Sequence, residues 1–455
     1  MLALQGPKIR SFAIAFPADT YDSTAFSFQA VIVERDMIAS SRVGWYRLFA
    51  LGLCLLAAKA SGQVFEEFMG APPPARNWLT DDQVAPAALF QPPALSQSTD
   101  PVRSPAPSRS LASRQRLASV PNMFGDFGMT VAVVQFVSPQ GVARGAFSVP
   151  GAGGSRRVKI GENNSPIPTD RAFFMYNHFH NAYQFQEINF TSFPPTLIQR
   201  QNPIDRFTLG VEKTFFDGDW SVEVRLPIVA SLAVQGETFA VEGGNWGNLA
   251  VIVKRLLYAD DNVALAAGLG IDAPTGSDFE SQFGGSTLRF ENDALHLLPY
   301  VGVVVDPGYG LFLMGYMQID IATAGNDVLF GPQGSAGQSV GRFNEQNLMY
   351  FDVGGGYWLY ENPYGECVTG VAALLEFHYT TAIQDTDEIA FGQQFTNAFI
   401  TTPGNRFDVV NVSAGVNVAF GEWSNLRVAG VFPLGDDFDQ RFFDAEVQVQ
   451  YNQRF

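Results

Sequence analysis

Segments in which apolar and polar residues alternate fill the chain from residue 171 to residue 455. In one of them the apolar residues Phe207, Leu209 and Val211 are spaced two apart, with Thr208 between them and Glu212 after them. Because successive side chains of a β-strand point to opposite faces, this spacing predicts strands with one apolar and one polar face. About twelve such segments are found, and each has roughly the 9–11 residues that a tilted strand needs to cross a bilayer.

The expected strands lie near residues 171–179, 205–216, 219–229, 246–258, 262–274, 294–305, 309–321, 347–359, 366–380, 406–420, 423–434 and 443–455. Their connections alternate between tight and long. Three of the five tight ones contain Asp-Gly, Pro-Gly or Asn-Pro, which favour turns. An even number of antiparallel strands with short turns at one end and long loops at the other is typical of a closed transmembrane β-barrel.

The composition argues against other classes of protein. Hydrophobic residues make up 46% of the chain, yet the longest apolar run, Leu48 to Ala58, is interrupted by Gly52 and falls short of the about 20 residues of a membrane helix. The formal charge of -17 disfavours nucleic acid as a partner. It favours cations or small neutral solutes.

The last strand ends on an aromatic residue, with Val447, Val449, Tyr451 and Phe455 on its apolar face. In this feature, residues 171–455 resemble bacterial outer-membrane β-barrel proteins of the porin or small-solute transporter type, although Gln453 departs from their usual pattern. The resemblance implies an all-β, closed, antiparallel up-and-down barrel in the cell outer membrane, with short periplasmic turns and long extracellular loops. It also implies contact with outer-membrane lipid and with the barrel-insertion machinery, which reads the last strand.

The N-terminal part divides into three expected segments. Residues 37–60 have the basic start, short apolar core and Ala-Lys-Ala ending of a secretory signal peptide. We therefore interpret residues 1–36 as an upstream overrun, with translation beginning at Met37. Residues 61–121 are rich in proline and are predicted to be a disordered periplasmic linker.

Residues 122–170 allow two interpretations. They are rich in turn-forming residues and carry the basic residues Arg156, Arg157 and Lys159. In an acidic protein this basic cluster could enter the barrel and form a constriction by pairing with carboxylates of the wall. The alternative is a solvated periplasmic segment.

The polar faces of the strands predict a charged, water-filled lumen. The expected lining residues are Arg206, Glu212, Glu223, Arg225, Asp320, Asp352, Glu376, Arg427 and Glu446. These residues predict a channel or transporter for small solutes with a weak preference for cations. The alternative function is a structural anchor that contacts the cell wall or a periplasmic partner through the proline-rich N-terminus.

No enzymatic or metal site is predicted. His178 and His180 have a spacing that could chelate a metal, but no third ligand is evident nearby. Glu376 and His378 share a strand face, yet no serine is evident beside His378 to complete a lipase-type site. The acidic segments 384–389 and 435–440 are interpreted as solvated loops rather than calcium sites. We therefore expect no enzymatic activity and no cofactor.

Overall fold

The computed structural model describes residues 116–126, 128–129, 131–137, 143–150, 156–189, 196–230, 234–235, 239–243, 246–283, 285–365, 367–385, 387–393, 396–401, 406–435 and 441–455. The expected signal peptide, the segment before it and residues 61–115 of the expected linker lie outside the described residues. Among the residues that are described, none belongs to a helix long and apolar enough to cross a membrane.

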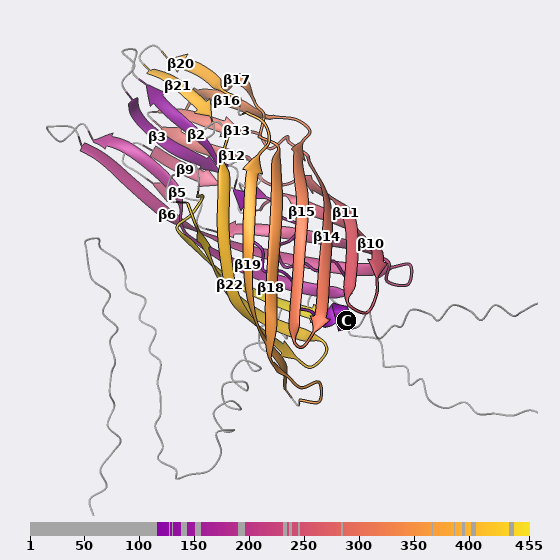
Figure 1. Ribbon diagram of the computed structural model, residues 1–455. Helices are drawn as coiled ribbons and strands as arrows, with labels where there is room; N and C mark the ends of the chain where they lie inside the picture. The colour runs from indigo at the N-terminus through magenta and orange to yellow at the C-terminus, as the bar shows by residue number, and fades with distance from the viewer. Residues whose placement is uncertain are drawn as a thin grey trace, which may run out of the picture. The chain divides into compact units, whose positions relative to one another are not determined.

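A closed β-barrel forms the main body of the described chain (Figure 1). Each of its strands pairs antiparallel with the next, and the last pairs with the first, Val449 opposite Tyr176. This closure confirms the all-β barrel of twelve strands that the sequence predicts. The strands are β5 (Arg171–Asn189), β6 (Thr196–Phe215), β7 (Trp220–Ala230), β10 (Leu249–Ala259), β11 (Val263–Ala273), β14 (His296–Gly308), β15 (Leu311–Ala322), β18 (Leu348–Glu361), β19 (Val368–Ala382), β22 (Asp408–Phe420), β23 (Ser424–Pro433) and β24 (Ala445–Arg454).

The barrel is apolar outside and charged inside. Val353 and Phe377 point outward and are 58% and 48% exposed, whereas Arg225 and Glu376 point inward and are 0% exposed. A soluble protein would place these side chains the other way round. The outer apolar surface fits contact with acyl chains, and closing the sheet leaves no edge strand with unpaired backbone groups in lipid. The barrel is therefore of the outer-membrane type.

The tight turns lie together at one end of the barrel. They connect β6 to β7, β10 to β11, β14 to β15, β18 to β19 and β22 to β23. Four of them expose aromatic side chains, since Phe216, Tyr309, Tyr364 and Trp423 are 78%, 98%, 95% and 59% exposed. In outer-membrane barrels the short turns face the periplasm and aromatic residues gather at the membrane interfaces. This end is therefore the periplasmic one.

The long connections at the other end fold into sheets, although the sequence analysis describes them only as loops. One sheet has six strands: β8 (Val234–Gln235), β9 (Phe239–Gly243), β12 (Phe279–Phe283), β13 (Ser286–Phe290), β16 (Asn326–Pro332) and β17 (Gln338–Phe343). A second group extends the barrel sheet through β2 (Val131–Val137), β3 (Ala143–Pro150), β20 (Ile389–Gln393) and β21 (Thr396–Thr401). Buried residues of both groups, among them Val134, Leu288, Phe290 and Ile400, belong to one apolar cluster.

If the outer face meets lipid, a charged substitution there should destabilise the barrel more the closer it lies to the middle of the membrane. Val428 lies near the middle of β23 and Leu434 just past its outer end, and both are exposed. We expect Val428→Arg to lower the free energy of unfolding by about 2–4 kcal/mol and Leu434→Arg by about 0–1 kcal/mol. Urea titration of the heat-modifiable folded form measures both. Equal costs for the two variants would contradict the assignment.

Candidate functional site

The barrel lumen is occupied by the protein's own chain. Two segments, residues 116–126 and 157–170, pack against the wall, and we call them together the lumen segment. Their side chains Leu117, Phe124 and Ile160 are 0% exposed. They form one apolar cluster with wall residues such as Leu298 and Phe312. All nine residues predicted to line the lumen are buried in the structure, at 0–4% exposure: Arg206, Glu212, Glu223, Arg225, Asp320, Asp352, Glu376, Arg427 and Glu446.

The lumen segment is held first at the periplasmic end. Arg116 forms an ion pair with Asp306 at the inner end of β14, with 2.8 Å between Nε and Oδ2. The guanidinium of Arg454, at the end of β24, donates to the carbonyl oxygen of Ala118. Deeper in the barrel, Arg427 donates to the carbonyl oxygens of Asn122 and Met123. Arginine side chains of the wall thus bind successive carbonyl groups of the entering chain.

Glu376 binds the backbone at the middle of the barrel. Its carboxylate accepts hydrogen bonds from the amides of Phe124 (2.7 Å) and Gly125 (3.0 Å). Gly125 has φ +76°, and a Cβ built there would lie 2.5 Å from the Cα of Glu162. Only glycine fits this position without strain, because the left-handed conformation and the close approach both exclude a side chain.

Lys159 lies between two carboxylates. Its ammonium group bonds to Asp126 of the lumen segment and, at 2.8 Å, to Asp352 of β18. Asp352 also accepts from His378 Nδ1 at 2.9 Å if that nitrogen carries the proton. Every charged atom in this group is buried. Burial of a charge without a partner costs several kcal/mol, so these side chains stabilise one another's positions.

Arg157 occupies the outer end of the lumen. Its guanidinium lies 3.0 Å from Asp320 and 3.1 Å from Glu345, and it donates to the carbonyl oxygen of Gln346 at 2.7 Å. The neighbouring Arg156 pairs with Met129 through the short strands β4 (Arg156–Arg157) and β1 (Gly128–Met129). The side chain of Arg156 lies outside the described part of the chain. Of the three basic residues in the predicted constriction, the structure thus places the Arg157 and Lys159 side chains beside wall carboxylates.

Arginines of the opposite wall bind the returning half of the lumen segment. Arg206 forms an ion pair with Glu162. Arg225 pairs with Glu223 and donates to the carbonyl oxygen of Lys159 at 3.1 Å. The wall therefore has carboxylates on β15 and β18 that face basic residues of the lumen segment, and a carboxylate on β19 that faces its backbone amides. Arginines on β6 and β7 face its carboxylate and carbonyl groups.

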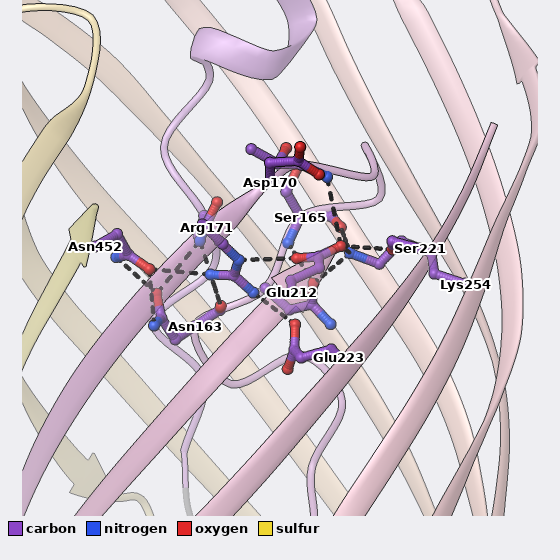
Figure 2. A network of polar contacts seen from close by, with 12 residues as sticks. Asn163, Ser165, Asp170, Arg171, Glu212, Ser221, Glu223, Lys254 and Asn452 are labelled. Atoms are coloured by element: carbon purple, nitrogen blue, oxygen red, sulfur yellow. Dashed lines mark hydrogen bonds and ion pairs between the residues drawn. The ribbon is translucent and has the colours of Figure 1, made fainter. Parts of the chain in front are cut away.

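The network in Figure 2 contains residues that the sequence analysis missed. Arg171, the first residue of β5, bonds to Glu212 (2.8 Å), Glu223 (2.7 Å) and the carbonyl oxygen of Asn163 (2.7 Å). Lys254 of β10 bonds to Glu212 at 2.9 Å, and it also reaches Asn164 and Ser165. Lys254 lies in a segment whose alternation is poor, so its inward direction was not evident from the sequence.

A further pair lies at the periplasmic rim, between Asp170, which precedes β5, and Lys213 near the end of β6. Asp170 bonds to Lys213 and to the amide and hydroxyl of Thr214 at 2.6 Å. Burial alone would raise the pKa of Asp170, but these hydrogen bonds outweigh it and lower the pKa. Lys213 is 53% exposed, so this pair contrasts with the sealed pairs deeper inside.

A serine does lie beside His378, which corrects the sequence analysis. Ser413 Oγ is 3.0 Å from His378 Nε2, because β19 and β22 pair in a register that places Ser413 opposite Glu376. Ser413 also donates to Glu376 at 3.2 Å. The serine, the histidine and Asp352 resemble a hydrolase triad in spacing. All are buried beneath the lumen segment, however, and Asp352 also holds Lys159, so we assign them to the network that binds this segment.

The remaining candidate positions have ordinary partners. The His178 ring lies 2.8 Å from Asp205, and Asp385 pairs with Arg406 at 2.6 Å, while residues 436–440 lie outside the described chain. In the C-terminal strand, Val447 is 47% exposed on the outer face together with Val449 and Tyr451. The side chain of Phe455 is 54% exposed at the periplasmic rim.

The chain was compared with known proteins. No protein-family model and no curated protein matches it. Among solved structures, the NanC porin is 8% identical and covers 63% of this chain and 98% of its own, with a TM-score of 0.33. An outer membrane channel from Pseudomonas putida F1 is 11% identical and covers 66% and 100%, with a TM-score of 0.39. The P. putida toluene transporter TodX is 9% identical and covers 63% and 90%, with a TM-score of 0.33. All three are outer-membrane β-barrel proteins.

Removing a buried charge from the lumen segment has a predicted cost. Lys159→Met leaves Asp126 and Asp352 buried without their main partner, and we expect it to lower the free energy of unfolding by about 3–5 kcal/mol. The matched control is Lys213→Met at the rim, where an exposed pair contributes about 0–1 kcal/mol. Urea unfolding of both variants in the same detergent measures the difference. If Lys159→Met lowers the free energy of unfolding no more than Lys213→Met does, the buried ion pairs do not stabilise the lumen segment.

Proposed function

We propose that this protein is an outer-membrane channel for small solutes whose lumen is closed by its own lumen segment. The observation that carries the proposal is that charged wall residues bind this segment. Glu376, for example, accepts from the amides of Phe124 and Gly125 at 2.7 and 3.0 Å, in addition to the hydroxyl of Ser413 in the neighbouring strand at 3.2 Å. A barrel that stays filled needs no buried charges, because well-packed apolar residues of similar volume are equally stable or more so. A charged wall suits a lumen that takes up water when the segment moves.

The wall charges also support the expected weak preference for cations. Without the lumen segment, Asp320 and Asp352 would lose Arg157 and Lys159, and Glu376 would lose two backbone donors. The buried wall carboxylates would outnumber the cationic groups by three: Glu212, Glu223, Asp272, Asp320, Glu345, Asp352, Glu376 and Glu446 against Arg171, Arg206, Arg225, Lys254 and Arg427. The preference is therefore expected to be small.

A second candidate function is an anchor. The chain that enters the barrel is bound to the wall by the Arg116–Asp306 ion pair and by Arg427 and Arg454, close to where residues 61–115 of the expected linker join it. Such a joint can transmit a pulling load from the periplasm to the barrel. In this case the proline-rich segment would contact the cell wall or a periplasmic partner.

Conductance tests the channel. Lys159→Glu places a third carboxylate beside Asp126 and Asp352, and like charges at this distance repel strongly in a buried site. We expect the native protein to show little conductance in planar bilayers, and Lys159→Glu and a variant lacking residues 122–170 to conduct with weak cation preference. Lys213→Glu at the rim is the matched control and should behave as the native protein. The proposal would be contradicted if neither Lys159→Glu nor the variant lacking residues 122–170 conducts, or if they prefer anions.

Cell-wall binding tests the anchor. Deleting residues 64–115 leaves the lumen segment intact and removes only the expected linker. If the anchor function holds, the native protein sediments with purified cell wall and the deletion variant does not, while both migrate as folded barrels on gels. Equal sedimentation of the two proteins would reject this second candidate.

A further inference from the structure

The lumen segment follows a direction that can be read from its wall contacts. Residue 116 meets Asp306 beside the β14–β15 turn, residue 118 meets Arg454, and residues 122 and 123 meet Arg427. Next, residues 124 and 125 meet Glu376, and Asp126 meets Asn411 of β22 at 2.7 Å. Each contact lies farther from the tight turns than the one before. The chain therefore enters at the periplasmic end and runs outward.

The second half of the lumen segment returns in the opposite direction. Arg157 meets Asp320 near the outer end of β15, and Lys159 meets Asp352. Residues 164 and 165 then meet Lys254 in the middle of β10, and Asp170 meets Lys213 at the periplasmic rim. The two halves also pair with each other, Met123 with Asn164 and β1 with β4. Together they form a hairpin that passes through the barrel.

The tip of this hairpin lies beyond the barrel. Between the two halves, β2 and β3 pair with each other; β2 also pairs with β21, Gln135 opposite Phe399, and β3 pairs with the outer part of β5, Phe147 opposite Phe185. Figure 1 shows β2 and β3 beside β20 and β21, away from the C-terminus. Val134 of β2 is fully buried in the apolar cluster of the outer sheets. The tip is thus a built part of the extracellular structure.

We infer that residues 116–170 are a through-barrel strap that joins the periplasmic proline-rich segment to the cell-surface sheet. Its outer end is fixed by strand pairing and its inner end by the arginines of the rim. A pull from the periplasm therefore acts on the outer sheet and does not simply withdraw the segment. The strap couples the two sides of the membrane, a role that goes beyond conduction.

The strap also restricts how the lumen can open, and this part rests on the proposed channel function. With β2 held between β21 and β3, the residues that fill the lumen stay tethered at both ends. Full opening then requires β2 and β3 to leave the surface sheet. Opening is accordingly controlled from the extracellular side, where a bound partner or ligand that competes for the β21 edge would favour it.

Surface labelling tests the strap without any conductance measurement. In a Cys367→Ser background, Gln140→Cys places a thiol between β2 and β3, Ser335→Cys places one in the exposed turn between β16 and β17, and Gln97→Cys places one in the proline-rich segment. Intact cells are treated with a maleimide polymer too large to pass porins. We expect labelling at 140 and 335 in intact cells and at 97 only after permeabilisation. Protection of position 140 together with 97 would overturn the strap.

A disulfide tests the control of opening. Gln135→Cys and Phe399→Cys lie directly opposite each other in β2 and β21, at a spacing that cross-strand disulfides can bridge. Added to Lys159→Glu in the Cys367→Ser background, the oxidised pair should reduce conductance at least tenfold, and a reductant should restore it. Each single cysteine is the control. Equal conductance of the oxidised and reduced protein would contradict control of opening from the extracellular side. If Lys159→Glu does not conduct in either the oxidised or the reduced state, the channel function is contradicted, and the labelling experiment alone then tests the strap.

Discussion

A charged side chain sealed inside a barrel must find a partner, because its burial without one costs several kcal/mol. This constraint organises the interior of the protein. Lys159 and Arg157 of the lumen segment stand among Asp126, Asp352, Asp320 and Glu345, and Arg206 and Arg427 of the wall bind that segment in return. The wall and the segment thus satisfy each other's buried charges. The closed state follows from this mutual pairing.

The barrel could be predicted from the sequence because the patterns that specify it lie within single strands and turns. A period of two fixes which face of a strand meets lipid, and turn-forming residues mark every periplasmic end, so the strand count and closure agree with expectation. The outer sheets were not predicted as sheets. Their strands are short. Phe279–Phe283 and Ser286–Phe290 pair with each other as a hairpin, but the hairpin joins a sheet only by pairing with β9 and β16, which lie far from it in the sequence.

For the lumen, only the presence of basic and acidic residues could be predicted from the sequence, not their contacts. The basic residues of 122–170 and the acidic residues of the wall were recognisable as opposite charges, which suggested that they could meet. Which carboxylate each would meet, and the place of Ser413 beside His378, depend on strand register and on the path of the lumen segment. Neither the register nor the path can be deduced from the spacing of residues within one strand. The inward direction of Arg171 and Lys254 could not be predicted for a similar reason. Arg171 is the first residue of β5, and Lys254 lies in a segment of β10 that is almost continuously apolar.

Hydrogen exchange of the lumen segment tests the central claim most directly. The amides of Phe124 and Gly125 donate to the buried carboxylate of Glu376, and amides sealed in this way exchange only when the structure opens. In the folded protein in lipid, we predict that peptides covering residues 117–126 and 158–165 exchange as slowly as the strands β19 and β22. Exchange of these peptides within the time typical of solvated loops, while the barrel strands stay protected, would show that the lumen is not closed by its own chain.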